Sequence, residues 1–154
     1  MRIRLATGTD LAAVTVCADL AFEIFAFNDR GIGSNSELVR RIRDGLVHLI
    51  YNDAEILGYI SFSQFSDHLY VDTLAVLPQH RGRGLGCRLL AFVESESVRH
   101  GLNSVKLFAD EKAGADVDFY RRRGYQETGR CEARDFGRVF FDKTIVPSPI
   151  GSKS

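Results

Sequence analysis

The chain of 154 residues carries 20 basic and 20 acidic side chains, so its formal net charge is zero, and 45% of its residues are hydrophobic. A chain of this length fits a single domain that buries a core of its own, and the ordinary hydrophobic share excludes a disordered or fibrous protein. The absence of a basic surplus argues against nucleic acid as a partner.

The N-terminus and the cysteines favour a cytoplasmic protein. No run of apolar residues reaches the roughly 18 that a membrane-spanning helix needs, and Met1–Leu5 lacks the apolar stretch of a signal peptide. Cys17, Cys87 and Cys131 match neither a disulfide framework nor the spacing of a zinc site. We therefore expect a protein without a membrane span or a metal, with Cys17 and Cys131 in its core.

The first third of the sequence predicts a strand and two helices. Residues 3–5 indicate a short strand. Thr9 and Asp10 then offer a cap for an amphipathic helix whose apolar residues recur at helical spacing as far as Phe25. A second, shorter helix ends at Gly45, because glycine readily adopts the left-handed conformation that closes a helix.

The remaining elements alternate between strand and helix. Residues 46–77 contain three β-rich runs separated by turn residues, which predicts an antiparallel meander. A helix then begins at Leu85 and leads into a strand over 105–109. A strand, a helix and a strand in this order make the two strands parallel neighbours. One more helix, over 115–123, precedes two final strands over 125–131 and 138–145.

The segment from Pro78 to Leu90 combines glycine with positive charge. It contains three arginines and no acid, which gives a local charge of +3 in a neutral chain. Glycine lets a ligand approach the backbone closely, and the start of a helix offers unpaired N–H groups and the positive end of the helix dipole. These features predict a cradle for a pyrophosphate, built from Arg81, Gly82, Arg83, Gly84, Gly86 and Arg88.

Two common phosphate-binding loops fit this segment poorly. A Walker loop needs a Lys-Ser or Lys-Thr pair after its glycines, and none follows Gly84 or Gly86. Those two glycines resemble part of a dinucleotide fingerprint, but Leu89 stands where the third glycine belongs. Residues 78–83 also separate the glycines from the preceding strand. A dinucleotide site is therefore the weaker alternative.

Three signatures together resemble the GNAT family of N-acetyltransferases. The segment 81–86 (R-G-R-G-L-G) matches the family motif R/Q-x-x-G-x-G/A, 74–78 (L-A-V-L-P) matches its strand ending in V-x-P, and 119–125 (F-Y-R-R-R-G-Y) matches its F-Y-x-x-x-G-F/Y. The resemblance implies an α/β (α+β) fold: a mixed, mostly antiparallel sheet of about seven strands with a parallel central pair, flanked by about four helices. It implies one domain over 1–146, with 147–154 as a tail.

The resemblance also implies acetyl-coenzyme A as the co-substrate. In the family, the backbone of the strand pairs with the pantetheine amides as an added strand would, and the N–H of Val76 donates to the thioester oxygen. Backbone amides of the glycine-rich segment hold the pyrophosphate, and arginine adds charge and a bidentate fork. The implied cofactor-binding residues are Leu74, Ala75, Val76, Arg81, Gly82, Arg83, Gly84, Leu85, Gly86 and Cys87.

The implied reaction is direct attack of a primary amine on the thioester. Tyr120 matches the family tyrosine that acts as general acid toward the sulfur of coenzyme A. The resemblance also implies Asp72 as the general base, because it stands two residues before Leu74, where many family members carry Glu or Asp. Strand alternation puts it on the same side as Val76, and its short side chain would act through a water. His68 and Tyr70 are weaker alternatives for the base.

The acceptor amine is left open by the sequence. In the family, the acceptor site is built from loops that correspond here to 27–36 and 132–137, and their mixed charges select neither a polyamine nor an acidic metabolite. A small molecule, a lysine side chain and a protein N-terminus all fit, and the resemblance allows a homodimer. The alternative function is a non-catalytic acyl-coenzyme A-binding regulatory module.

Overall fold

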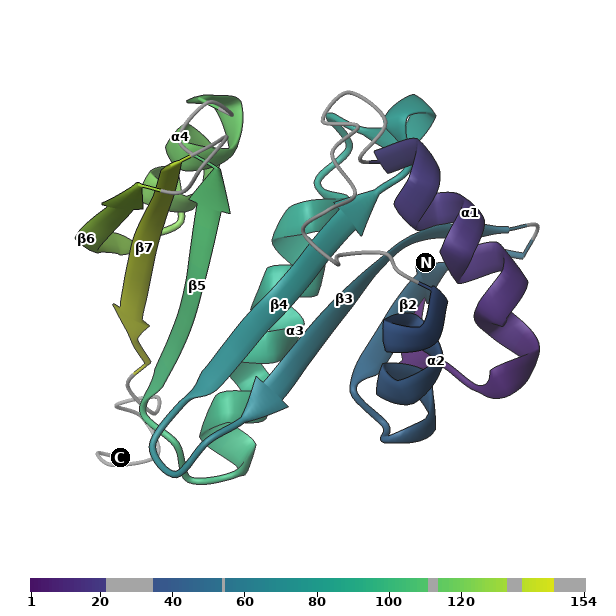
Figure 1. Cartoon of the computed structure of the whole chain (residues 1–154), viewed down its shortest axis with the longest axis horizontal. Helices are drawn as coiled ribbons and strands as arrows, with labels where there is room; N and C mark the ends of the chain where they lie inside the picture. Colours follow the sequence, from purple (N-terminus) through teal and green to yellow (C-terminus); the bar gives the residue numbers. More distant parts are fainter. Residues whose placement is uncertain (22–34, 54, 111–113, 133–136, 146–154) are drawn as a thin grey trace. The chain divides into compact units, whose positions relative to one another are not determined.

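A computed structural model describes residues 1–21, 35–53, 55–110, 114–132 and 137–145 of the chain (Figure 1). The chain divides into two compact units, Met1–Ser63 with Asp72–Ala91 and Gln64–Val71 with Phe92–Ser154, called here the first and the second unit. Both units receive residues from the strands β3 (Ile56–Gln64) and β4 (Leu69–Val76) and from helix α3 (Leu85–Arg99). The prediction of one domain over 1–146 stays a prediction.

The order of the elements is the predicted one, with boundaries that differ by one or two residues where both ends are described. Each helix begins and ends near the capping and glycine signals of the sequence. In chain order the elements are β1 (Arg2–Leu5), the 3₁₀ turn η1 (Gly8–Asp10), α1 (Leu11–Ala21), α2 (Asn35–Arg43), β2 (Val47–Tyr51), β3 (Ile56–Gln64), β4 (Leu69–Val76), the 3₁₀ turn η4 (Pro78–His80), α3 (Leu85–Arg99), β5 (Ser104–Asp110), α4 (Gly114–Arg122), β6 (Gln126–Glu132) and β7 (Gly137–Thr144).

The strands form one seven-stranded mixed sheet in the order β1-β2-β3-β4-β5-β7-β6. The strands β1, β2 and β3 pair antiparallel, as do β5, β7 and β6. The strands β4 and β5 pair parallel, with Leu69 opposite Val105 and Tyr70 opposite Lys106. The predicted parallel pair is therefore confirmed, and its cause is the helical crossover through α3.

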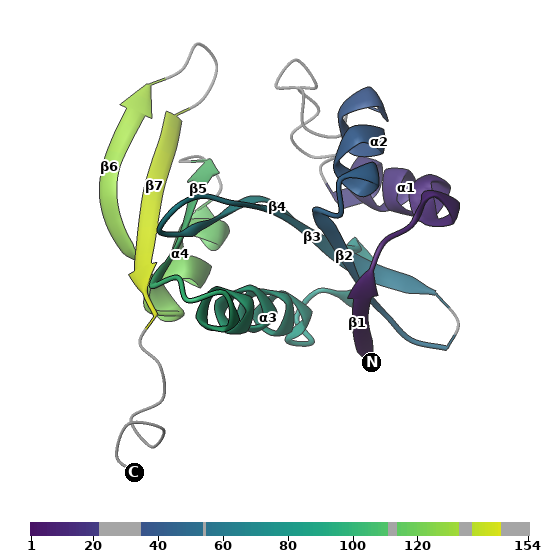
Figure 2. The ribbon, with the colours of Figure 1, turned by 90° about the horizontal axis from the view of Figure 1, so that it is seen from below.

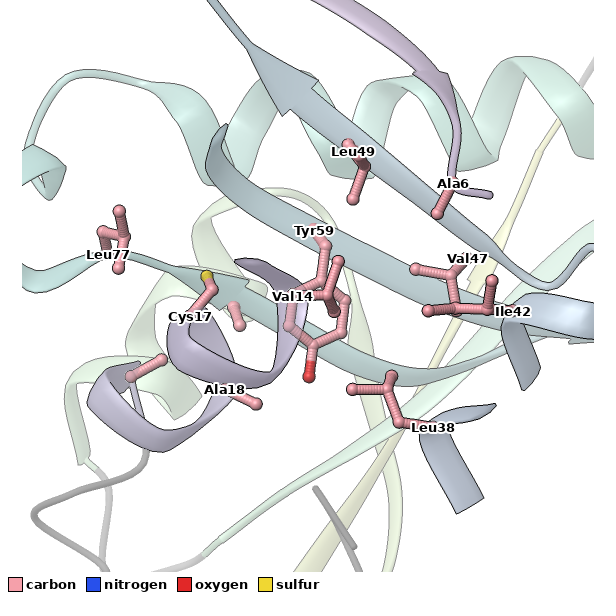
Figure 3. Close-up of a cluster of buried hydrophobic side chains, with 12 residues drawn as sticks. Ala6, Val14, Cys17, Ala18, Leu38, Ile42, Val47, Leu49, Tyr59 and Leu77 are labelled. Carbon is pink, nitrogen blue, oxygen red and sulfur yellow. The ribbon is translucent and has the colours of Figure 1, made fainter. Parts of the chain in front are cut away.

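The core of the first unit lies between its strands and the helices α1 and α2. In Figure 2 these two helices lie on one side of β1, β2 and β3, and α3 starts on the other side. Figure 3 shows side chains of α1, α2 and β2 gathered around the Tyr59 ring of β3, which is 2% exposed. The buried cluster comprises Ala6, Val14, Cys17, Ala18, Ala21, Leu38, Ile42, Val47, Leu49, Tyr59, Ala75 and Leu77.

Helix α1 begins at Leu11, as predicted, but the capping residue differs from the prediction. The cap expected at Thr9 and Asp10 lies one turn earlier, where the backbone N–H of Thr7 donates to Asp10 Oδ2 at 2.8 Å. Both Arg4 Nη atoms also donate to the Asp10 carboxylate, each at 2.9 Å. Arg4 lies on β1. Its pairing with Asp10 therefore depends on a strand outside the helix, and the sequence of the helix alone does not predict it.

The expectation that Cys17 and Cys131 both lie in the core is half wrong. Cys17 is buried, and burial raises the pKa of its thiol to about 12 against the opposing effect of Arg81. Cys131 is exposed, because β6 is the last strand of the sheet order and has a neighbour along only one edge. Among the residues described, no helix is long and apolar enough to cross a membrane.

Candidate functional site

The glycine-rich loop of the first unit connects η4 to α3. Gly82 and Gly84 adopt φ angles of +79° and +78°, the left-handed region that side-chain-bearing residues rarely enter. A Cβ added at either position would meet nothing within 4 Å. The backbone conformation therefore requires glycine here, while the space beside both residues stays open for a ligand to approach.

The first turn of α3, which follows this loop, carries N–H groups that have no acceptor within the helix. The backbone N–H of Arg88 donates to the carbonyl of Gly84 at 3.1 Å, which is the first bond of the helical ladder. The N–H groups of Leu85, Gly86 and Cys87 precede that bond, so the helix itself provides no acceptor for them. Three such amides at the positive end of a helix form a site that suits a phosphate.

Arg81 of the loop and Arg88 of the first turn of α3 contact other parts of the first unit. Arg81 Nη2 donates to the carbonyl of Ala21, the last residue of α1, at 3.0 Å. Arg88 Nη2 donates to the carbonyl of Met1 at 3.2 Å. Both residues are exposed, so each guanidinium keeps positive charge at the surface.

The third arginine belongs to a chain of hydrogen bonds through His80. Arg83 Nη1 lies 2.5 Å from His80 Nδ1, and His80 Nε2 lies 3.0 Å from Glu55 Oε2. A guanidinium only donates, so Nδ1 accepts and the ring proton sits on Nε2, which donates to Glu55. The imidazole therefore links the loop to the start of β3 and orients Arg83.

Strand β4 presents backbone groups at the edge opposite to β3. The backbone N–H of Leu77, which follows β4, donates to the carbonyl of Leu57 in β3 at 2.9 Å. Successive peptide groups of an extended chain point to opposite edges, so the N–H of Val76 points away from β3. This direction suits the role predicted for Val76 as a backbone donor to a ligand.

The predicted base, Asp72, is held by two donors in the first unit. Arg41 Nη1 of α2 lies 2.6 Å from Asp72 Oδ2, and Ser63 Oγ of β3 donates to the same oxygen at 2.9 Å. The side chain of Asp72 keeps 18% of its surface exposed. Both donors reach one carboxylate oxygen, so the orientation of the carboxylate is fixed.

Arg41 itself is part of a larger polar cluster. Its Nε donates to Glu37 Oε2 at 2.7 Å, and its Nη1 donates to Ser61 Oγ at 3.0 Å. Burial acts to lower the pKa of Arg41, but the hydrogen bonds and negative charges of Asp72 and Glu37 outweigh burial and raise it. The guanidinium is therefore a permanent cation between two carboxylates.

The predicted general acid, Tyr120, lies in the second unit on α4. Its ring packs against Phe119, Tyr125 and Phe141, with centroid distances of 5.2, 6.0 and 5.9 Å. Burial raises the pKa of Tyr120 above its ordinary value, and the negative charge of Asp116 adds to the rise. The hydroxyl therefore stays protonated at neutral pH and is available as a hydrogen-bond donor.

The alternative bases, His68 and Tyr70, belong to the second unit, each with neighbours there. His68 Nδ1 lies 2.6 Å from Asp67 Oδ1, and its ring stacks on Phe65 with 4.9 Å between the centroids. Tyr70 lies on β4, opposite Lys106 of β5. The predicted acceptor loops, 27–36 and 132–137, fall mainly on residues outside the described part of the chain.

Sequence reasoning missed the partners of Asp72. Glu37 and Arg41 are four residues apart on α2, and that spacing alone could have indicated an ion pair on one helix face. The reach of Arg41 to β4 has no such local signal, since 31 positions separate the two residues in sequence. Among the residues described, no group of three or more His, Cys, Asp or Glu is placed to hold a metal.

Comparison with known proteins identifies relatives over most of the chain. The model of the "Acetyltransferase (GNAT) family" matches residues 18–125. An aminoalkylphosphonate N-acetyltransferase of Salmonella typhimurium is 32% identical, and the match covers 78% of this chain and 80% of that protein. An S-alkylcysteine N-acetyltransferase of Bacillus subtilis is 25% identical over 94% of this chain and 89% of that protein.

Solved structures share the fold at lower sequence identity. The paia N-acetyltransferase of Thermoplasma acidophilum, in complex with coenzyme A, has a TM-score of 0.80 at 17% identity, covering 93% of this chain and 98% of that one. The ribosomal-protein-S18-alanine N-acetyltransferase of Escherichia coli also has a TM-score of 0.80, at 18% identity, covering 96% and 95%. At these identities the likeness concerns the fold alone.

Proposed function

Because the chain belongs to the GNAT family of acetyltransferases, we propose that it transfers an acetyl group from acetyl-coenzyme A to the primary amine of a small molecule. The observation that carries the proposal is the glycine-rich loop before α3, where Gly82 and Gly84 are left-handed and have open space beside them. The first amides of α3 follow this loop and have no acceptor within the helix. Family membership supports acetyl-coenzyme A as the donor, and the loop fits the pyrophosphate of that molecule.

The glycine-rich loop and the start of α3 bind the pyrophosphate of the co-substrate, and β4 binds its thioester end. The amides of Leu85, Gly86 and Cys87 hold the pyrophosphate, and Arg83 adds charge from an orientation that His80 fixes. The N–H of Val76 points away from β3. This direction supports its role as donor to the thioester oxygen, where negative charge develops during attack.

Two side chains manage the protons. An amine attacks only as the free base, so Asp72 accepts a proton from the ammonium group, through a water because its side chain is short. Arg41 and Ser63 occupy Oδ2, so the transfer uses Oδ1. Tyr120 donates its hydroxyl proton or a hydrogen bond to the departing sulfur. Its raised pKa keeps the hydroxyl protonated and favours the hydrogen bond, because a weaker acid releases its proton less readily.

A small-molecule acceptor is favoured by the named relatives. The two bacterial relatives described above are named for S-alkylcysteine and for aminoalkylphosphonate, and both names denote small amines. Relatives named for protein substrates resemble this chain at the level of the fold. We place the reaction in the cytoplasm, in keeping with three widely spaced cysteines, and a homodimer stays a prediction.

A release assay tests the proposal. The chain is incubated with acetyl-coenzyme A and a panel of S-alkylcysteines, aminoalkylphosphonates, aminoglycosides and peptides bearing lysine or an N-terminal alanine. Free thiol and acetylated product are measured together. We expect turnover with at least one small amine, and a loss in kcat of roughly 100-fold or more for D72N and roughly 10-fold or more for Y120F, in the range typical of proton-transfer groups.

Matched variants separate chemistry from folding. D44N changes an exposed carboxylate of the same unit, and Y51F removes a tyrosine hydroxyl from β2. Both should keep the kcat of the parent within about twofold, as is usual for substitutions away from a site. Binding of acetyl-coenzyme A without thiol release from any amine would instead favour the non-catalytic regulatory module. Turnover of the peptides alone would contradict a small-molecule acceptor.

A further inference from the structure

Asp72 is tied to α2 by an ion pair that the catalytic role alone does not explain. Arg41 Nη1 and Asp72 Oδ2 are 2.6 Å apart, and their side chains keep only 22% and 18% of their surface exposed. An ion pair this shielded from water is oriented more firmly than one on an open surface. The contact also joins two elements, α2 and β4, that are distant in sequence.

Arg41 is itself anchored on its far side. Its Nε donates to Glu37 Oε2 at 2.7 Å, one helical turn earlier on α2, and its Nη1 also reaches Ser61 Oγ at 3.0 Å. Ser63, two residues along β3, donates to Asp72 Oδ2 at 2.9 Å. The carboxylate oxygen Oδ2 therefore receives two donors whose own positions are fixed by a helix and a strand.

We propose that Arg41 is a positioning residue for acetyl transfer, which with Ser63 holds Asp72 Oδ2 and leaves Oδ1 to accept the proton of the acceptor amine through the intervening water. This inference rests on the proposed function, in which Asp72 is the base. Arg41 touches neither the amine nor the thioester and acts through Asp72. A carboxylate that can rotate loses alignment with the amine, and misplacement by about 1 Å can cost on the order of 100-fold in rate.

The cluster contains its own control at the neighbouring position. Arg40 also binds Glu37, with Nη2 2.6 Å from Oε1 and 2.7 Å from Oε2, but its side chain is 55% exposed. Arg40 forms an ion pair with Glu37, whereas Arg41 also forms one with Asp72. R40Q and R41Q therefore remove the same charge from the same helix, and only R41Q removes a donor from the base.

Steady-state kinetics of the full chain, with the amine found in the release assay, test the inference. We expect R41Q to lower kcat by about 10- to 100-fold while the KM for acetyl-coenzyme A changes by less than about twofold. R41K keeps the charge and one donor and should recover about tenfold of that loss. R40Q should keep kcat within about twofold.

A double-mutant cycle tells positioning from a general structural defect. If Arg41 acts through Asp72, R41Q/D72N is no slower than D72N alone, because the base that Arg41 orients is already lost. If the effect of R41Q is purely structural, the fold losses in kcat of R41Q and D72N multiply in the double mutant. If R41Q fails to fold, the cycle is run with S63A, which removes the smaller donor to the same oxygen.

The outcomes separate this inference from the proposed function. Equal kcat for R41Q and R40Q, or multiplicative losses in the cycle, would overturn the positioning role while a slow D72N variant leaves the base in place. Full activity of D72N would overturn both the base and the role of Arg41. Absence of turnover in the parent chain with every amine would overturn the proposed function and this inference together.

Discussion

At the residue scale, Asp10 is a carboxylate of the first unit that contributes to the stability of the fold. It accepts both Arg4 Nη atoms and the backbone N–H of Thr7, while only 8% of its surface is exposed. The hydrogen bond from Arg4 is the main reason that the pKa of Asp10 falls from 3.8 to about 2, against the opposing effect of burial. The carboxylate thereby joins the start of α1 to β1.

The depressed pKa predicts a pH-dependent effect of D10N. Because the pKa is lower in the folded chain than its ordinary value of 3.8, ionised Asp10 stabilises the fold above that pH, and the contribution is lost as the pH falls toward about 2. We expect D10N to lower the free energy of unfolding at pH 7, and the difference from the parent to shrink between about pH 4 and pH 2. Urea unfolding at a series of pH values measures it.

A matched variant accompanies this measurement. Asp19 is an exposed carboxylate on α1, so D19N should leave the free energy of unfolding nearly unchanged at every pH. A constant difference between D10N and the parent down to pH 2 would mean that the amide disturbs packing and that the ion pair contributes little.

At the residue scale, the sequence predicted the base but not the residues that hold it. The position of Asp72 in the motif-bearing strand made it the predicted base, and strand alternation placed it on the side of Val76. Nothing near it in sequence indicated Arg41 or Ser63, because both contacts arise only when α2 and β3 come against β4.

At the scale of elements, the connection from η4 to α3 is the feature that we propose binds the pyrophosphate of the co-substrate. Gly82 and Gly84 both lie in the left-handed region, and open space surrounds the position of a Cβ at each. An alanine there has room but an unfavourable backbone, so the loop would relax away from the geometry that presents the α3 amides.

G84A is therefore expected to weaken binding more than folding. The strain of a left-handed alanine is about 1–2 kcal/mol, which lowers stability modestly. The altered direction of the amides should raise the Kd for coenzyme A by about tenfold or more, measured by isothermal titration calorimetry. G8A serves as control, since Gly8 also has open space for a Cβ but no left-handed φ. Unchanged Kd for G84A would show that the arginines, and not the amides, hold the ligand.

The elements themselves were predictable because their signals are local. Apolar spacing, turn residues and glycines at φ of +75° and +73° at positions 45 and 101 mark the ends of α2 and α3. The start of α1 at Leu11 was predicted, but its cap was not: the capping interaction of Thr7 with Asp10 lies at the start of the 3₁₀ turn η1, and Arg4 of another element supports it.

At the scale of the whole molecule, the zero net charge conceals an uneven distribution. The segment from Pro78 to Leu90 holds three arginines and no acid, whereas the chain as a whole balances 20 bases with 20 acids. A ligand that carries a pyrophosphate should therefore bind this one loop and stabilise the folded chain, because a ligand of the native state shifts the folding equilibrium.

Thermal unfolding of the full chain checks this expectation. At a concentration about 100 times its Kd, coenzyme A should stabilise the chain by about 2.7 kcal/mol, which raises Tm by several degrees. Pantetheine lacks the pyrophosphate and should give a much smaller shift at the same concentration. Equal shifts from the two ligands would place the binding energy on β4 alone and contradict the role of the loop.

The sequence by itself determined the order of the elements, the parallel pairing of β4 with β5, the family and the loop that suits a pyrophosphate. These follow from local patterns: periodicity, capping residues, a strand–helix–strand connection and a spacing of arginine and glycine. The tertiary structure alone decided which side chains meet, such as Arg41 with Asp72 and Arg81 with the end of α1. Contacts of that kind join residues 31 and 60 positions apart, and no local pattern encodes them.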